Sequence, residues 1–67
     1  MEKITLNGNT EEVETPMSAI DLLEKFGFEQ RFVAIAVNRK CILKKDYKST
    51  LIKAGDDIEV LSPAAGG

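Results

Sequence analysis

An unbroken apolar run, Phe-Val-Ala-Ile-Ala-Val at residues 32–37, limits the folds open to this chain. A strand with one face in water alternates polar and apolar residues, so this run predicts an interior strand that a helix covers on at least one face. The chain has 67 residues and room for one domain, so the cover has to come from that same domain. Its single cysteine, Cys41, excludes an internal disulfide, and packing must supply the stability.

The N-terminal residues predict a β-hairpin. Residues 3–7 alternate, with Ile4 and Leu6 on one side. Asn7-Gly8 follows, a strong hairpin signal because both residue types tolerate positive φ. Residues 10–14 then read as the return strand, with Val13 facing inward.

A helix of about ten residues is expected next. Ser18 is suited to the N-cap, with Asp21 three residues on in the manner of a capping box, and Thr15-Pro16 offers a second start. Gly27 suits the left-handed residue that closes a helix. Between them lies an apolar stripe typical of a core-facing helix: Ala19, Ile20, Leu22, Leu23 and Phe26.

The second half of the chain predicts short elements. After the apolar strand we expect a turn at 38–40, a short strand at 41–43, an irregular loop at 44–53 anchored by Tyr47 and Leu51, a turn at 54–57, and a last strand at 58–62 that Pro63 ends. This order predicts an α+β domain, residues 1–62, with one main helix on a mixed four- to five-stranded sheet. The β-grasp fold has this order, with its first and last strands parallel at the centre. Residues 63–67 would be a flexible tail.

Composition narrows the function. A domain this small has little room for a buried active site, which favours a binding module or a carrier over an enzyme. The chain has no histidine and one cysteine, so a zinc site lacks a ligand set. Its net charge of −2 predicts no general attraction to nucleic acid or to an anionic membrane. No apolar run is long enough to span a bilayer. Because Glu2 and Lys3 lead straight into strand-like alternation, we expect no signal peptide and a cytoplasmic location.

Basic residues gather in one stretch of the sequence. The stretch reads either as a solvated face with a loop or as a docking patch for an acidic partner. RNA binding fits less well, because Tyr47 is the one aromatic ring available there for stacking. The basic residues of the stretch are Arg39, Lys40, Lys44, Lys45, Lys48 and Lys53.

The sequence ends in Gly66-Gly67, preceded by the small residues Ala64 and Ala65. Two terminal glycines alone indicate no more than a frayed end. Here the last strand runs directly into the tail, and Gly67 would carry the α-carboxylate. A tail without bulky side chains can thread a narrow channel in another enzyme, where ATP would convert the carboxylate to an acyl adenylate.

Two segments resemble the signature of the ThiS family, the ubiquitin-like sulfur carriers of thiamine biosynthesis. They are residues 33–38, Val-Ala-Ile-Ala-Val-Asn, and residues 54–60, Ala-Gly-Asp-Asp-Ile-Glu-Val, followed by the terminal Gly66-Gly67. The resemblance covers almost the whole chain, and Tyr47 stands where the family often has an aromatic residue.

The resemblance implies a β-grasp fold and a carrier that is not itself an enzyme. A ThiF-like activating enzyme would use ATP to adenylate Gly67, which would then become a thiocarboxylate. The sulfur would come from a cysteine desulfurase or another donor and pass to a thiazole synthase. Ala64, Ala65 and Gly66 would thread the channel, the chain would bind no cofactor of its own, and it would be a monomer when free.

We expect Leu61 and Pro63, which flank the tail, to supply apolar contacts to partner enzymes.

The chain departs from the family pattern at two positions. Leu43 replaces a common family proline, which leaves the shape of the following loop open. Cys41 stands where an aliphatic residue is usual and is expected to be a small core residue rather than a sulfur relay. The acidic pairs 56–57 and 11–12 are expected to be solvated carboxylates rather than a metal site.

Three alternatives stay open. A MoaD-like carrier for molybdopterin, or for another sulfur-transfer pathway, would use the same tail, although such chains are typically longer. A ubiquitin-like modifier would join the same activated glycine to lysines of other proteins. A non-reactive interaction module would not need the tail at all.

Overall fold

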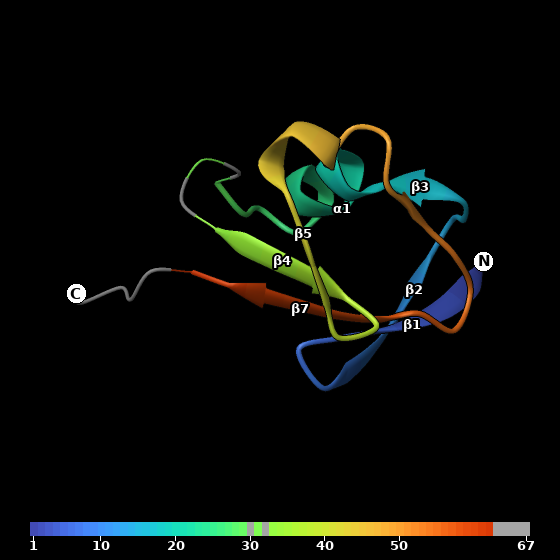
Figure 1. Cartoon of the computed structure of the whole chain (residues 1–67). Coiled ribbons are helices and arrows are strands. Elements are labelled where there is room, and N and C mark those ends of the chain that lie inside the picture. The colour runs from blue at the N-terminus through green and yellow to red at the C-terminus, as the bar shows by residue number, and fades with distance from the viewer. Residues whose placement is uncertain (30, 32, 63–67) are drawn as a thin grey trace.

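The computed structural model of the protein describes residues 1–29, 31 and 33–62. Its main layer is a five-stranded sheet, and one helix, α1 (Ala19–Lys25), lies across one face of it (Figure 1). The strands follow the order β2 (Asn9–Val13), β1 (Glu2–Leu6), β7 (Asp57–Leu61), β4 (Ala34–Val37) and β5 (Lys40–Ile42). A second sheet of two short strands, β3 and β6, lies beside the start of the helix.

The N-terminal hairpin is confirmed. Strands β1 (Glu2–Leu6) and β2 (Asn9–Val13) pair antiparallel, with Leu6 opposite Asn9. Asn7 and Gly8 form the two-residue turn, with φ of 50° and 84°. Two consecutive positive φ angles match the turn twist that a tight hairpin requires, which is why this dipeptide is effective there.

The centre of the sheet is built around the last strand, β7 (Asp57–Leu61). It runs parallel to β1 on one side and antiparallel to β4 (Ala34–Val37) on the other. Strand β5 (Lys40–Ile42) pairs with β4 and forms the edge of the sheet. The sheet is mixed, its first and last strands are parallel at the centre, and the predicted β-grasp fold is confirmed.

Helix α1 (Ala19–Lys25) begins and ends at the predicted signals but has seven residues rather than ten. The Ser18 hydroxyl accepts a hydrogen bond from the Asp21 N–H at 3.0 Å. At the other end Gly27, with φ of 77°, donates to the Glu24 carbonyl, and Phe28 donates to the Leu23 carbonyl at 2.8 Å. This pair of bonds is a Schellman closure, and it ends the helix at Lys25.

The expectation of an irregular loop at 44–53 is wrong in part. The segment holds a 3-10 turn, η2 (Lys44–Asp46), and strand β6 (Leu51–Ile52), which pairs with β3 (Met17–Ser18). Because β3 occupies the residues before the helix, the alternative helix start at Thr15-Pro16 is also wrong. Tyr47 is an anchor as predicted, 2% exposed, with its hydroxyl donating to the Val33 carbonyl at 3.3 Å.

The second predicted anchor, Leu51, is 54% exposed, whereas Ile52 is fully buried. Successive residues of a strand face opposite sides, so in β6 one of the two enters the core and the other faces water. The apolar strand is likewise covered on one face: Val33 and Ile35 are buried while Ala34 is exposed. One core serves the whole domain, formed by residues such as Ile4, Leu22 and Ile58.

Candidate functional site

The candidate site begins where the chain leaves β7. This strand alternates, with Ile58 and Val60 buried under the helix and Asp57, Glu59 and Leu61 exposed on the opposite face. Leu61, its last residue, pairs with Ala34 of β4. Residues 63–67 lie outside the described residues. They include the predicted reactive Gly67, the predicted contact Pro63 and the predicted threading residues Ala64, Ala65 and Gly66. The structure therefore describes the strand that precedes the tail, β7, and not the tail itself.

The end of β7 is fastened on its β1 side by Asn7. The Asn7 N–H donates to the Ile58 carbonyl at 2.9 Å. The Asn7 side chain then continues the ladder, because its Oδ1 accepts from the Val60 N–H at 2.8 Å and its Nδ2 donates to the Val60 carbonyl at 3.3 Å. Strand β1 ends at Leu6, so this amide takes the place of a further strand residue beside Val60.

A second asparagine fastens the beginning of the same strand. Asn38, at φ of 51°, donates its N–H to the Asp57 carbonyl at 2.7 Å, and its Oδ1 accepts from the Asp57 N–H at 3.0 Å. Its Nδ2 donates to an Asp56 carboxylate oxygen at 3.1 Å. Both ends of β7 are thus held by asparagines in left-handed turns, which gives the strand a fixed position and direction.

The sequence predicts neither contact with β7. It predicts Asn7 as a hairpin residue and Asn38 as part of a turn, and both predictions are correct for the local chain. Their bonds to β7 join residues 53 and 19 positions apart. An asparagine at the end of a strand is the one sequence signal for such a contact. Its short amide side chain can hydrogen-bond the main chain of the neighbouring strand where the asparagine's own strand has ended.

The sheet face opposite the helix carries exposed apolar residues next to the end of β7. Leu61 is 66% exposed, and its cross-strand partner Ala34 is exposed as well. Leu43, which directly follows β5, is 61% exposed. We call the paired residues Leu61 and Ala34 the apolar row. Exposed apolar residues in a group, next to a strand that leads out of the domain, are typical of a protein contact surface.

Cys41 is exposed, and the expectation that it is a small core residue is wrong. It pairs with Ala36, which pairs in turn with Glu59 of β7. Glu59 is on the exposed face, and directly opposite residues share a face, so Cys41 lies on the open side of the sheet. Because β5 is an edge strand, no further strand of the described sheet shields the thiol.

The carboxylates of the described residues do not gather into a metal site. Among residues 1–29, 31 and 33–62, there is no group of three or more side chains that could hold an ion. The Asp56 carboxylate accepts hydrogen bonds from Asn38 and from the Lys53 N–H at 2.8 Å, which gives it a structural role in the turn. Asp57 and Glu12 are exposed.

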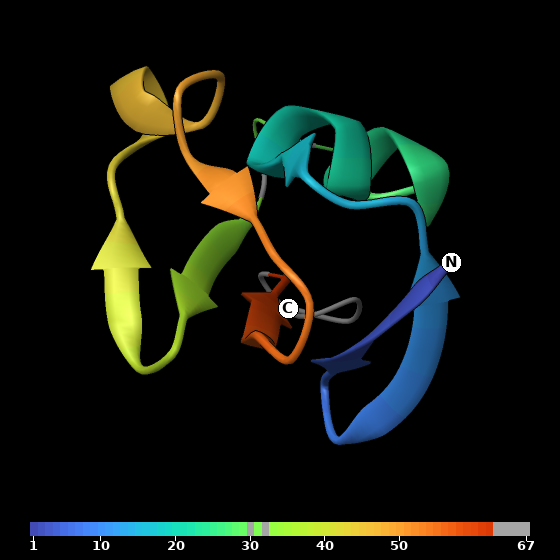
Figure 2. The ribbon, with the colours of Figure 1, turned by 90° about the vertical axis from the view of Figure 1, so that its right-hand side faces the viewer.

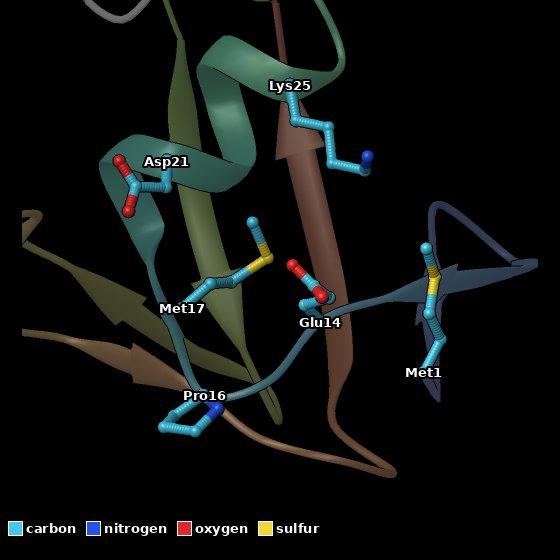
Figure 3. Close-up of a pocket in the computed structure, with 6 residues that line it drawn as sticks. All are labelled: Met1, Glu14, Pro16, Met17, Asp21 and Lys25. Atoms are coloured by element: carbon cyan, nitrogen blue, oxygen red, sulfur yellow. The ribbon is translucent and has the colours of Figure 1, made fainter.

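A cavity of about 300 Å³ lies between the start of the chain and the helix. The residues that line it include Met17, the acidic residues Glu14 and Asp21, and the basic residue Lys25. Figure 3 shows that the Asp21 carboxylate points away from Glu14 and Lys25. With charges of both signs that do not converge on one point, the cavity shows no preference for a charged ligand.

No helix in the described part of the chain is both long enough and apolar enough to cross a membrane. Among curated proteins, none matches the chain significantly. The model of the ThiS family matches residues 2–67, nearly the whole sequence.

Two similar solved structures come from Geobacter metallireducens. A crystal structure of the thiamine biosynthesis protein ThiS is 25% identical, covers 97% of this chain and 99% of that chain, and superposes with a TM-score of 0.83. A solution structure of a thiamine biosynthesis protein is 24% identical, covers 97% of this chain and 87% of that chain, and has a TM-score of 0.82. Both therefore share the fold described above over almost its full length.

Proposed function

The chain belongs to the ThiS family, and on that premise we propose that it is a sulfur carrier of thiamine biosynthesis that other enzymes charge at Gly67. The observation that carries the proposal is the extent of the family match, residues 2–67, which takes in the terminal Gly66-Gly67 as well as the domain. In this role the chain is a protein cosubstrate and not an enzyme.

The proposed chemistry takes place in two steps. A carboxylate oxygen of Gly67 attacks the α-phosphorus of ATP, pyrophosphate leaves, and an acyl adenylate forms. A sulfur nucleophile then attacks the glycine carbonyl carbon and AMP leaves. If the donor is a cysteine persulfide, the first product is an acyl disulfide, and a second thiol cleaves its S–S bond to leave the thiocarboxylate. ATP belongs to the activating enzyme, and the carrier itself binds no cofactor.

The described residues supply position rather than reactivity. Asn7 and Ala34 hold the last residues of β7 from both sides, so the tail starts from a strand with a fixed direction. A fixed starting point reduces the freedom that the tail loses when it enters a narrow channel, and this lowers the entropic cost of reaching the reactive geometry. Gly66, with Ala65 and Ala64 before it, would pass through that channel.

Docking would bring three kinds of partner to the carrier. These are a ThiF-like adenylating enzyme, a thiazole synthase, and a cysteine desulfurase or other sulfur donor. We propose that Leu61 and Pro63 contact these enzymes through apolar surface, with the rest of the apolar row beside them. Leu61 is suited to this because it is exposed at the last position of β7. The setting would be cytoplasmic, with the free carrier a monomer.

Removal of Gly67 tests the proposal. ATP–pyrophosphate exchange with a ThiF-like enzyme should occur with the whole chain and stop with the shortened one. Urea unfolding should be the same for both chains, because the described core ends before the tail. Exchange that continues without Gly67 would refute the assignment of the reactive carboxylate. Exchange that stops together with a loss of folding would refute the separation of domain and tail.

A further inference from the structure

The basic stretch of the sequence has no part in the proposed tail chemistry. Two of its residues, Lys40 and Lys53, line a groove on the surface. This groove of about 330 Å³ lies between the β4–β5 hairpin and the segment that contains β6. Figure 2 shows β5, in yellow, and β6, in orange, on either side of this region. We call it the β5–β6 groove. Its apolar lining includes Val37, Ile42 and Leu51, and its charged lining is Lys40, Lys53 and Asp56.

The charges in the β5–β6 groove favour an acidic ligand. Within the described ranges, neither Lys40 nor Lys53 forms an ion pair with a carboxylate. Asp56 is the one acidic residue of the lining, and its two oxygens accept hydrogen bonds from Asn38 and from the Lys53 main chain. The two ammonium groups thus remain available to a partner, while the one carboxylate is already occupied by the protein.

The groove also has an apolar wall. Leu51 is 54% exposed although its strand neighbour Ile52 is fully buried. Ile42 and Val37 are partly buried and pack against the edge of the core. A groove at the lower end of the size range of ligand sites holds a few side chains, not a large molecule. One apolar side chain between two acidic ones fits this combination of an apolar wall and two ammonium groups.

We propose that the β5–β6 groove binds an acidic segment of a partner protein. The segment sets an apolar side chain against Leu51 and Ile42 and places carboxylates beside Lys40 and Lys53. The groove meets Asn38, which holds the beginning of β7, so it lies about 13 Å along the strand from Leu61. Binding there leaves the end of β7 uncovered, and this inference does not depend on the carrier function.

A fluorescein-labelled peptide with aspartates and glutamates around a central leucine tests the inference by anisotropy on the whole chain. We expect saturable binding that weakens as salt is raised. The double change Lys40→Ser and Lys53→Ser should weaken it roughly fivefold to tenfold, since two exposed ion pairs are lost. Leu51→Ser should weaken it as well, whereas Lys25→Ser, which removes a charge on α1, should leave it unchanged.

Four results would overturn the inference. They are no binding of the peptide, equal binding by the double lysine variant, equal binding of a peptide whose central leucine is replaced by serine, and tighter binding of single-stranded RNA than of the peptide at the same salt. Urea unfolding of each variant shows whether it is folded. If Leu51→Ser unfolds the domain, the leucine-free peptide still tests the apolar contact.

Discussion

Asn7 hydrogen-bonds both main-chain groups of Val60, a residue 53 positions later, through Oδ1 at 2.8 Å and Nδ2 at 3.3 Å. The bonds join the first turn of the chain to the strand that precedes the tail. They give one side chain two roles, since the same residue has the positive φ that closes the β1–β2 hairpin.

Replacing Asn7 by glycine separates these roles. Glycine keeps the turn conformation and removes both bonds to Val60, so we expect the free energy of unfolding to fall by about 1–2 kcal/mol. Urea unfolding followed by circular dichroism measures it. Asn9→Ser, an exposed position on β2, is the control and should change little. Equal stability of the two variants would contradict the role of the Asn7 amide.

Tyr47→Phe tests whether the segment after β5 is fastened by the buried hydroxyl. The change removes the hydrogen bond to the Val33 carbonyl. Because Tyr47 and Val33 are both buried, that carbonyl loses this partner inside the core. We expect a loss of about 1 kcal/mol in unfolding free energy, with the same β-grasp fold. Circular dichroism is the suitable probe because the change removes the only tyrosine. A variant as stable as the parent would show that ring packing alone holds the segment.

Local signals predicted much of this fold. Asn7-Gly8, Ser18 and Gly27 each act within a few residues, through a turn angle, a cap and a left-handed closure, and each is where the sequence placed it. Strand β6 was missed because its two residues form a strand only by pairing with Met17 and Ser18, far earlier in the chain. A two-residue strand carries too short a pattern to be distinguished from a loop.

The site was predictable only in part. The tail could be read from its glycines and small residues, since its proposed chemistry depends on residue type. The asparagines that fasten β7 could not, because their partners are set by which strands become neighbours. Cys41 was misplaced for the same reason: whether a residue of a short strand faces the core depends on register and on which strand forms the edge.

The exposure of Cys41 predicts that its thiol reacts in the folded protein. With Ellman's reagent we expect full labelling in buffer, at a rate within about tenfold of that in urea, because no further strand of the described sheet shields it. The release of thionitrobenzoate is followed by absorbance. Labelling that waits for global unfolding would mean that Cys41 is buried.

The proposed contact of Leu61 predicts a change in docking without a change in stability. Leu61→Asp places a charge in the apolar row, and because Leu61 is 66% exposed the free energy of unfolding should change by less than about 0.5 kcal/mol. The KM of a ThiF-like enzyme for the carrier should rise about tenfold or more. Thr10→Asp adds the same charge at exposed β2, on the far edge of the sheet, and serves as control. Equal KM values for the two variants would remove Leu61 from the docking surface.

Intact-mass spectrometry of the whole chain tests the carrier assignment most directly. The chain is incubated with ATP, a ThiF-like activating enzyme and a sulfur donor, and parallel samples omit each in turn. We predict a mass increase equal to the difference between sulfur and oxygen, located at Gly67 by fragmentation and seen in the complete mixture alone. An unchanged mass in the complete mixture, with an activating enzyme shown to charge another ThiS-family carrier, would contradict it.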